Sequence, residues 1–335
     1  MTHRSAAPLV TGIALALALA APAHTGTSTL QPDKLIILST TDIKGKTLPC
    51  GCHVPKGGIA RQVGFADSVR QLYSNVVRVD GGGFFPEDDT RADVAWFMMD
   101  ELKKMDAAAV GVGERDLHYG LAALRVNAQR TAVPLVCSNL VLASTKKPVF
   151  ATTIVKPVGA ATVGFFGLIS DKANLGPARD SLAATDPVVA ARRAVADLKQ
   201  KGATVIVLLS RLGKAETEDL VTTVDGIDVA IAGQSVPYLD QGRPFKHTTV
   251  VYGGEQGQYL GFSRVTLDAT KHAGAIDAVT YMMGPALREN AEVAARVTAF
   301  EDGLKQRQQS AGAEKEKAAP PAEAPKEGAP KSGGR

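Results

Sequence analysis

The feature that most constrains the fold is an alternation of short apolar runs with longer amphipathic stretches through the middle of the chain. The short runs are rich in Val, Ile and Leu and end at Gly, Asp or Ser, which is typical of buried strands. Stretches such as residues 59–72 and 187–201 instead carry apolar side chains at helical spacing. The expected strands cover residues 34–38, 76–79, 108–112, 134–136, 162–168, 204–209, 228–232, 249–252 and 259–267. This alternation predicts an α/β domain whose strands are buried on both faces.

The two ends of the chain differ from this middle part. Residues 9–21 are uncharged and largely apolar, and small residues at 21–23 suit signal-peptide cleavage. A membrane anchor needs about 20 apolar residues, so we expect a cleaved signal peptide over residues 1–23, a periplasmic or secreted protein, and no stable membrane insertion. Residues 305–335 are rich in Ala, Pro, Glu and Lys and predict a disordered tail. Residues 32–304 are then the folded domain.

Charge and cysteine content exclude several classes of function. The chain has 38 Lys and Arg against 34 Asp and Glu, a net charge of +4 that is spread along the sequence. Nucleic-acid binding proteins carry a clustered basic surface, so we expect no nucleic-acid partner. Three cysteines are too few for a scaffold held together by disulfides.

Polar and glycine-rich segments follow several of the expected strands, at the edge of the sheet where α/β proteins place their chemistry. They cover residues 41–45, 80–83, 113–120, 210–213 and 233–236. In order they read TDIKG, DGGG, GERDLHYG, SRLG and GQSV.

The order and spacing of these segments resemble the 5′-nucleotidase branch of the calcineurin-like metallophosphoesterases. In that family the corresponding motifs are N/T-D-x-H-G, D-x-G-D, G-N-H-E-F-D-Y-G, S-H-x-G and G-H-T-H. A PCGC insert at residues 49–52 is similar to a C-G-C element in a subset of exported bacterial members. The resemblance covers about residues 34–268, the catalytic part of the family. It implies an α/β fold that is a four-layer αββα sandwich.

The same resemblance implies two divalent metal ions, held by Asp, Asn and His, that activate a hydroxide for attack on a phosphoester. Of the family's ligands this sequence keeps only Asp42. The other positions of the family's site are occupied by Lys44, Gly83, Glu114, Arg115, Arg211, Gln234 and Val236. Glycine and valine side chains offer no ligand atom, and lysine and arginine bring positive charge. We therefore expect a degraded di-metal centre and assign no catalytic residue.

Three of the replacements are cations, Lys44, Arg115 and Arg211, which we expect to point into one cleft. Arginine suits bidentate recognition of phosphate or carboxylate, so one interpretation is an anion-binding pocket. The other is an internal salt-bridge network in which these cations pair with Asp42, Asp80, Glu114 and Asp116. The sequence leaves both open.

A second candidate site is the segment Cys50-Gly51-Cys52-His53, on the loop that leaves the first strand. Two thiolates and an imidazole suit one Zn or Cu ion. The candidate metal ligands are Asp42, Cys50, Cys52, His53, Glu114 and Asp116. The cysteines can equally form a reducible redox pair or a structural disulfide. Any other cofactor is unknown.

These observations favour an exported, non-catalytic accessory protein that binds a small anion or a metal ion. Two alternatives stay open. One is a phosphoester or nucleotide hydrolase with a rebuilt metal site, and the other is a module that binds a protein partner through its surface.

Overall fold

The computed structural model describes residues 30–88 and 91–318. The expected signal peptide, residues 1–23, lies outside the described residues. Within them, none of the helices combines the length and the apolar content that crossing a membrane requires.

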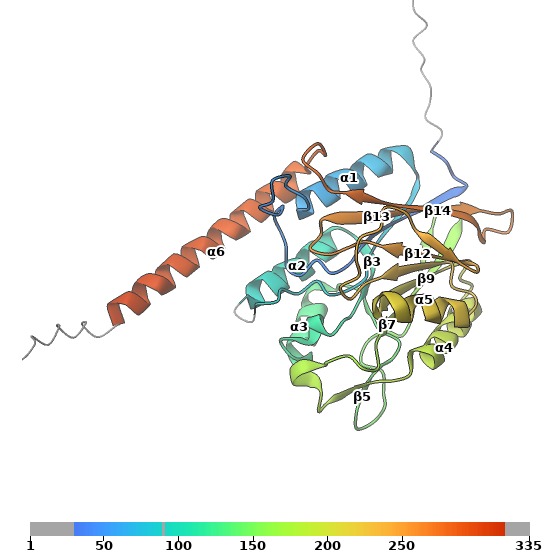
Figure 1. The fold of residues 1–335 in the computed structure, drawn as a ribbon, viewed down its shortest axis with the longest axis horizontal. Coiled ribbons are helices and arrows are strands. Elements are labelled where there is room, and N and C mark those ends of the chain that lie inside the picture. The colour runs from blue at the N-terminus through green and yellow to red at the C-terminus, as the bar shows by residue number, and fades with distance from the viewer. Residues whose placement is uncertain (1–29, 89–90, 319–335) are drawn as a thin grey trace, which may run out of the picture.

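Two six-stranded sheets pack face to face and form the centre of the domain (Figure 1). The first sheet has the spatial order β14 (Ala273–Met282), β13 (Tyr259–Leu267), β1 (Lys34–Thr40), β2 (Asn75–Asp80), β3 (Ala107–Gly111) and β4 (Leu135–Val136). The second has the order β11 (Arg243–Phe245), β12 (Thr248–Tyr252), β10 (Val229–Ala232), β9 (Val205–Arg211), β7 (Ala161–Ile169) and β6 (Ile154–Val158). A separate antiparallel pair joins β5 (Leu140–Leu142) to β8 (Leu182–Ala184).

Helices cover the outer face of each sheet. The first sheet is covered by α1 (Ile59–Leu72), α2 (Ala92–Lys104), α3 (Leu121–Thr131) and α6 (Ala291–Ala318). The second is covered by α4 (Pro187–Gln200) and α5 (Gly213–Thr223). The expected four-layer αββα sandwich is thus confirmed.

Strand β1 shows why the core strands read as continuous apolar runs. Leu35 and Ile37 pack between the two sheets, whereas Ile36 and Leu38 pack on the other face among residues that include Ala66 of α1. Since successive side chains of a strand point to opposite faces, a strand between a second sheet and a helix layer needs apolar residues at every position. Strands β1 to β4 are parallel, so their carboxyl ends meet at one edge.

Helix α6 extends beyond the point where the sequence predicted the fold to end. Val293, Val297 and Leu304 are buried against the core, and the helix then continues to Ala318 and projects from the body of the molecule (Figure 1). The helical conformation therefore continues past residue 304, whereas Leu304 is the last described residue of α6 that is buried against the core. Residues 305–318 are rich in Ala, Lys, Gln and Glu, which have high helix propensities. The rest of the expected disordered tail, residues 319–335, lies outside the described residues.

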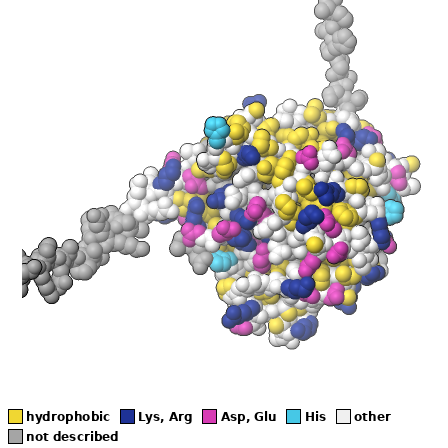
Figure 2. Space-filling model, in the orientation of Figure 1, with side chains coloured by type: hydrophobic (Ala, Val, Ile, Leu, Met, Phe, Trp, Pro, Cys, Tyr) yellow, Lys and Arg dark blue, Asp and Glu magenta, His cyan; other side chains and the backbone are white. Residues whose placement is uncertain are grey.

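The surface carries charges of both signs. On the face shown in Figure 2, Lys and Arg side chains are interspersed with Asp and Glu side chains and do not gather by sign.

Candidate functional site

The loops that follow β1 and β2 are joined by their backbones. The Asp42 N–H donates to the Gly82 carbonyl at 2.9 Å and the Lys44 N–H donates to the Gly83 carbonyl at 3.0 Å. Both Asp42 and Lys44 have left-handed backbone conformations, with φ of 50° and 54°. This close approach places Asp42 at the carboxyl edge of the first sheet, as the sequence motif predicts.

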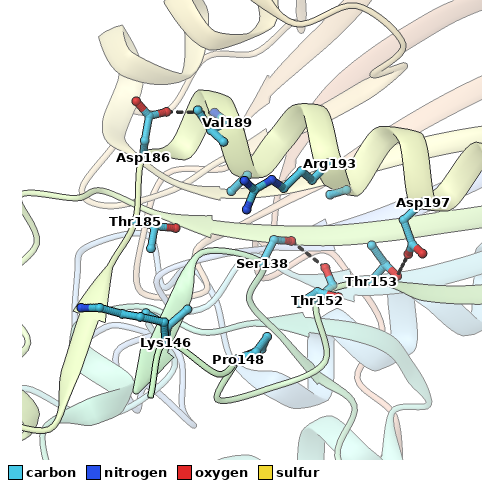
Figure 3. Close-up of a pocket in the computed structure, with 13 residues that line it drawn as sticks. Ser138, Lys146, Pro148, Thr152, Thr153, Thr185, Asp186, Val189, Arg193 and Asp197 are labelled. Carbon is cyan, nitrogen blue, oxygen red and sulfur yellow. Dashed lines mark hydrogen bonds between the residues drawn. The ribbon is translucent and has the colours of Figure 1, made fainter. Parts of the chain in front are cut away.

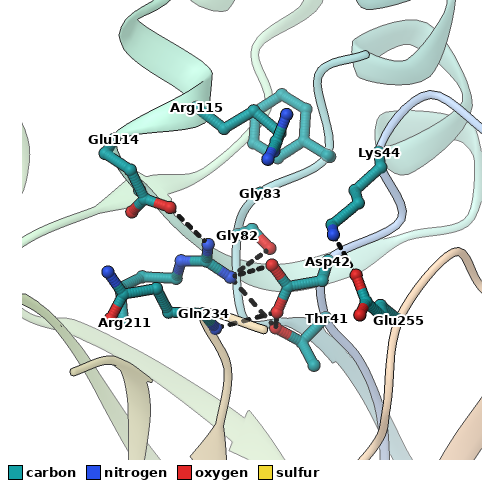
Figure 4. Close-up of polar contacts among 12 residues, drawn as sticks. Thr41, Asp42, Lys44, Gly82, Gly83, Glu114, Arg115, Arg211, Gln234 and Glu255 are labelled. Atoms are coloured by element: carbon teal, nitrogen blue, oxygen red, sulfur yellow. Dashed lines mark hydrogen bonds and ion pairs between the residues drawn. The ribbon is translucent and has the colours of Figure 1, made fainter. Parts of the chain in front are cut away.

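The centre of the site is a buried ion pair contributed by both sheets (Figure 4). Arg211 is the last residue of β9, and its Nη1 lies 2.8 Å from Asp42 Oδ1. Each of these side chains is 1% exposed. The other end of the guanidinium, Nη2, lies 3.0 Å from Glu114 Oε1, and Nη1 also donates to the Gly82 carbonyl at 3.2 Å. Asp42 in turn accepts the Gln234 N–H on Oδ2 at 2.8 Å.

Glycines surround the Arg211 guanidinium. A Cβ atom at Gly83 would lie 2.8 Å from Nη1 and 2.9 Å from Nη2. At Gly113 it would lie 2.5 Å from Nε, and at Gly233 it would lie 2.9 Å from Nη1. The guanidinium therefore fits only because these positions lack side chains. Gly83 is also the position at which the family resemblance implies a metal-bridging Asp. The side chain of an Asp there would collide with the Arg211 guanidinium, so the loss of that carboxylate and the presence of Arg211 are linked.

The electrostatics of the site follow from this burial. Burial alone would lower the pKa of Arg211, but the negative charges of Asp42, Glu114 and Asp116 together raise it. Arg211 is therefore a permanent cation at the strand ends. Asp116 is fully buried, and its carboxylate accepts backbone N–H groups from Gly83, Phe84, Phe85 and Gly113. Burial raises the pKa of Asp116 to about 6.

Asp80, at the end of β2, has no ion pair with any of the cations that the structure describes. Its carboxylate accepts the Thr40 hydroxyl at 2.6 Å and the Gly82 N–H at 2.8 Å. Burial raises the pKa of Asp80 to about 7. Asp80 and Asp116 thus fix the loops around the site by binding hydroxyl and backbone donors.

The other two expected cations are paired nearer the surface. Lys44 binds the carboxylate of Glu255 and lies 3.4 Å from Glu87, while Arg115 lies 3.2 Å from the same Glu87 oxygen. With Arg211 enclosed, the three cations do not gather in one open pocket, and each is paired with a carboxylate. The partners agree only in part with the salt-bridge interpretation: Asp42 and Glu114 bind Arg211, whereas Lys44 and Arg115 bind carboxylates outside the expected set. Sequence reasoning missed Glu87 and Glu255, although each lies in a glycine-rich segment that follows a core strand.

The six expected metal ligands do not form one site. Asp42 and Glu114 bind Arg211, Asp116 binds backbone N–H groups, Cys50 and Cys52 are joined in a disulfide, and His53 is exposed. Across residues 30–88 and 91–318, no group of three His, Cys, Asp or Glu side chains is placed to hold a metal ion. The residues at the strand ends therefore do not fit the two-metal centre that the fold family implies, since a buried guanidinium competes for their carboxylates. The third cysteine, Cys137, is free and buried.

A separate cavity of about 570 Å³ lies between α4 and the segment around β5 (Figure 3). Lys146 and Arg193 line it, and neither side chain has an ion pair or hydrogen bond with any other described residue. Its acidic side chains are already engaged: Asp186 caps α4 by accepting the Val189 N–H, and Asp197 binds Lys201. Sequence reasoning missed this cavity because none of its residues belongs to the motifs at the strand ends.

Comparisons with known proteins agree with the fold. No family model matches the chain. The chain is 25% identical to a 2′,3′-cyclic-nucleotide 2′-phosphodiesterase/3′-nucleotidase of Salmonella typhimurium, over 59% of this chain and 34% of that protein. It is 28% identical to an apyrase of Aedes aegypti, over 42% of this chain and 26% of that protein. The chain therefore spans about a third or less of the length of these curated relatives.

Solved structures extend the likeness to most of the chain. The 5′-nucleotidase precursor of Thermus thermophilus superposes with a TM-score of 0.71 and 25% identity, over 82% of this chain and 60% of that one. A calcineurin-like phosphoesterase from Bacillus subtilis superposes with a TM-score of 0.68 and 19% identity, over 82% of this chain and 97% of that one. Over the shared part, the chain is a 5′-nucleotidase-like calcineurin-like metallophosphoesterase in its fold.

Proposed function

We propose that this chain is a non-catalytic accessory protein that uses a 5′-nucleotidase-like fold for binding and does not hydrolyse phosphoesters. The observation that carries the proposal is the ion pair between Asp42 and Arg211, buried among glycines at the strand ends. A metal ion in such a site provides open coordination positions and lowers the pKa of a bound water. A guanidinium provides neither. It has no hydrogen-bond acceptor and stays protonated, so it cannot remove a proton from a water molecule to generate a nucleophile.

The nearby carboxylates are poorly suited to replace that chemistry. Asp116 is enclosed by four backbone N–H groups, and Asp42 is held by Arg211 and the Gln234 N–H. A general base must reach the proton that it removes, and neither group is exposed to a substrate. The relatives by sequence are named as a 2′,3′-cyclic-nucleotide 2′-phosphodiesterase/3′-nucleotidase and an apyrase, which makes a hydrolase with a rebuilt metal site the alternative to exclude.

The ligand that we propose is a small anion, bound in the cavity between α4 and β5. Lys146 and Arg193 support this location for the anion, because they are cations without a carboxylate partner among the described residues. The cavity also presents apolar side chains of Val141 and Val189, which suit an anion with an apolar body.

We also propose that the protein is exported. The apolar segment at residues 9–21 and the small residues at 21–23 support this, as does the Cys50–Cys52 disulfide, because disulfides persist in oxidising compartments. Expression of the full chain in a Gram-negative host should yield a periplasmic protein that begins at His24. An intact Met1 terminus in the membrane fraction would contradict the proposal.

The activity test uses residues 24–335 with a phosphomonoester, a phosphodiester, 5′-AMP and 2′,3′-cyclic AMP. Each substrate is assayed with Mg²⁺, Mn²⁺, Co²⁺ or Zn²⁺. Turnover should equal the background of a mock preparation from cells without the gene. Hydrolysis that persists through purification and disappears in an Asp42→Asn variant would overturn the proposal.

A further inference from the structure

The Cys50–Cys52 disulfide lies on the surface beside the strand-end loops. Gly51, Cys52 and His53 are exposed, and Cys50 is half-buried. Cys50 and Gly51 line a cavity of about 290 Å³ that also borders Gly45, next to the paired residue Lys44. A reactant in solution can therefore reach the disulfide without any movement of the core.

The loop that carries the disulfide is closed by backbone hydrogen bonds. The Cys50 N–H donates to the Lys56 carbonyl at 2.8 Å, and Pro49 and Gly57 form an antiparallel bridge. The Ile59 N–H donates to the Thr47 carbonyl at 3.0 Å, which ties the loop to the start of α1. A disulfide stabilises a fold mainly by restricting the unfolded chain, and more so for long loops. Since this one joins residues two apart, the loop should keep its shape after reduction.

The two sulfur atoms have different surroundings. Cys50 Sγ accepts the Lys56 backbone N–H at 3.3 Å. A hydrogen bond to sulfur favours the thiolate, so Cys50 is the better leaving group. Cys52 is exposed and therefore open to attack. The third cysteine cannot exchange with this pair, because Cys137 is buried and burial raises the pKa of its thiol to about 11.

We propose that Cys50 and Cys52 form a redox-active pair that accepts two electrons from a dithiol. A thiolate of the dithiol attacks Cys52 Sγ, a mixed disulfide forms, and the electron pair of the broken bond goes to Cys50 Sγ. The second thiolate of the dithiol then attacks the other sulfur of the same dithiol, which is bonded to Cys52 Sγ, and the Cys52 thiolate is released. The dithiol becomes a disulfide, and its two protons are recovered on Cys50 and Cys52. This activity is independent of the proposed lack of hydrolysis.

The test uses the oxidised chain of residues 24–335 and an equimolar, reduced peptide that contains a Cys-x-x-Cys sequence. After acid quenching and maleimide labelling, mass spectrometry should show two new thiols per chain at Cys50 and Cys52, and an oxidised peptide. The thermal midpoint of the reduced chain should lie within about 3 °C of the oxidised chain. A peptide that stays reduced, or a reduced chain that loses its fold, would overturn the proposal.

Two single variants test the order of the steps. The thiol pKa of Cys50 in the Cys52→Ser chain and that of Cys52 in the Cys50→Ser chain are measured from the pH dependence of iodoacetamide alkylation. Cys50 should titrate at a lower pH than Cys52, because its sulfur accepts the Lys56 backbone N–H. Equal values, or the reverse order, would contradict the assigned roles. Stoichiometric Zn²⁺ binding that blocks maleimide labelling of the reduced chain would also overturn the redox role, in favour of a metal site.

Discussion

The guanidinium of Arg211 and the carboxylate of Asp42 form an ion pair 2.8 Å long in which each side chain is 1% exposed. The two residues come from different sheets, so the pair joins the sheets at the edge where their loops meet. Breaking such a pair from one side leaves a charge without a partner in the protein interior, which costs far more than breaking an exposed pair. The first prediction follows from this difference.

Arg211→Ala should lower the free energy of unfolding by about 3–5 kcal/mol, because Asp42 loses its counter-ion. The matched control is Arg130→Ala, which removes a pair between Arg130 and Asp100 whose side chains are 49% and 35% exposed. Exposed pairs contribute about 0–1 kcal/mol. The free energy of unfolding of both variants is measured by urea denaturation at neutral pH. A loss below about 1 kcal/mol for Arg211→Ala would mean that Asp42 is not left as an uncompensated charge.

Gly83→Ala should destabilise the protein through the Arg211 guanidinium. The control is Gly120→Ala, because Gly120 has a similar φ of 82° against 74° at Gly83, but no atom lies within 4 Å of its added Cβ. Backbone strain alone should cost about 1–2 kcal/mol at either position. Steric crowding should add about 1–3 kcal/mol at Gly83. The added Cβ would also lie 2.9 Å from Asp42 Oδ1, so the added cost should fall, but not to zero, when both glycine variants are compared in an Arg211→Ala background. An unchanged cost in that background would show that Arg211 is not the cause.

The stability that Asp80 contributes should fall as the pH rises from about 4 to about 7. Burial raises the pKa of Asp80 to about 7, whereas an unfolded chain titrates near 3.9. Between these values the folded protein holds a proton that the unfolded protein lacks, so the free energy of unfolding decreases by up to about 1.4 kcal/mol per pH unit for that proton. Asp80→Asn keeps a hydrogen-bond acceptor for the Gly82 N–H and removes the titration. Urea unfolding at pH 5, 6, 7 and 8 should therefore give a shallower slope for Asp80→Asn than for wild type.

Phosphate or sulfate should stabilise the protein through the cavity between α4 and β5. At ten times its dissociation constant a ligand adds about 1.4 kcal/mol, and Arg193→Ala should remove that effect. Arg192→Ala is the control, since Arg192 is the next residue of α4 but donates to the Thr223 carbonyl instead of lining the cavity. The thermal midpoint is measured with and without each salt for wild type and both variants. The salt should raise it in wild type and Arg192→Ala but not in Arg193→Ala. Stabilisation that survives in the Arg193→Ala variant would place the anion elsewhere.

Much of the fold could be predicted from the sequence because the core strands are buried on both faces. Helix α1 was expected at residues 59–72 and is observed at Ile59–Leu72, and β13 likewise matches residues 259–267. Strand β14 was missed. It lies at the edge of its sheet beside β13, with one further bridge between Val279 and Gln241, and Gly274, Ala275 and Asp277 are exposed. A strand at the edge of a sheet needs no apolar run, so its sequence carries little signal.

The site could be predicted only in outline. The spacing of the motifs brings Asp42, Glu114 and Arg211 to one edge, as observed. Whether Arg211 would face solvent or turn inward depends on the space left by Gly83, Gly113 and Gly233, which come from three separate segments. The sequence of any one of these segments therefore does not predict how much space is left for the Arg211 side chain.

The fit between Gly83 and Arg211 also restricts the routes by which this protein can change. A carboxylate restored at position 83 alone would collide with the guanidinium, since even a Cβ there would lie 2.8 Å from Nη1. A histidine restored at position 211 alone would remove the only side-chain cation that the described residues place within bonding distance of Asp42. Each single step toward a metal-binding sequence therefore passes through a less stable protein. The two positions are therefore coupled, and a return to the family's ligand residues would require both to change together.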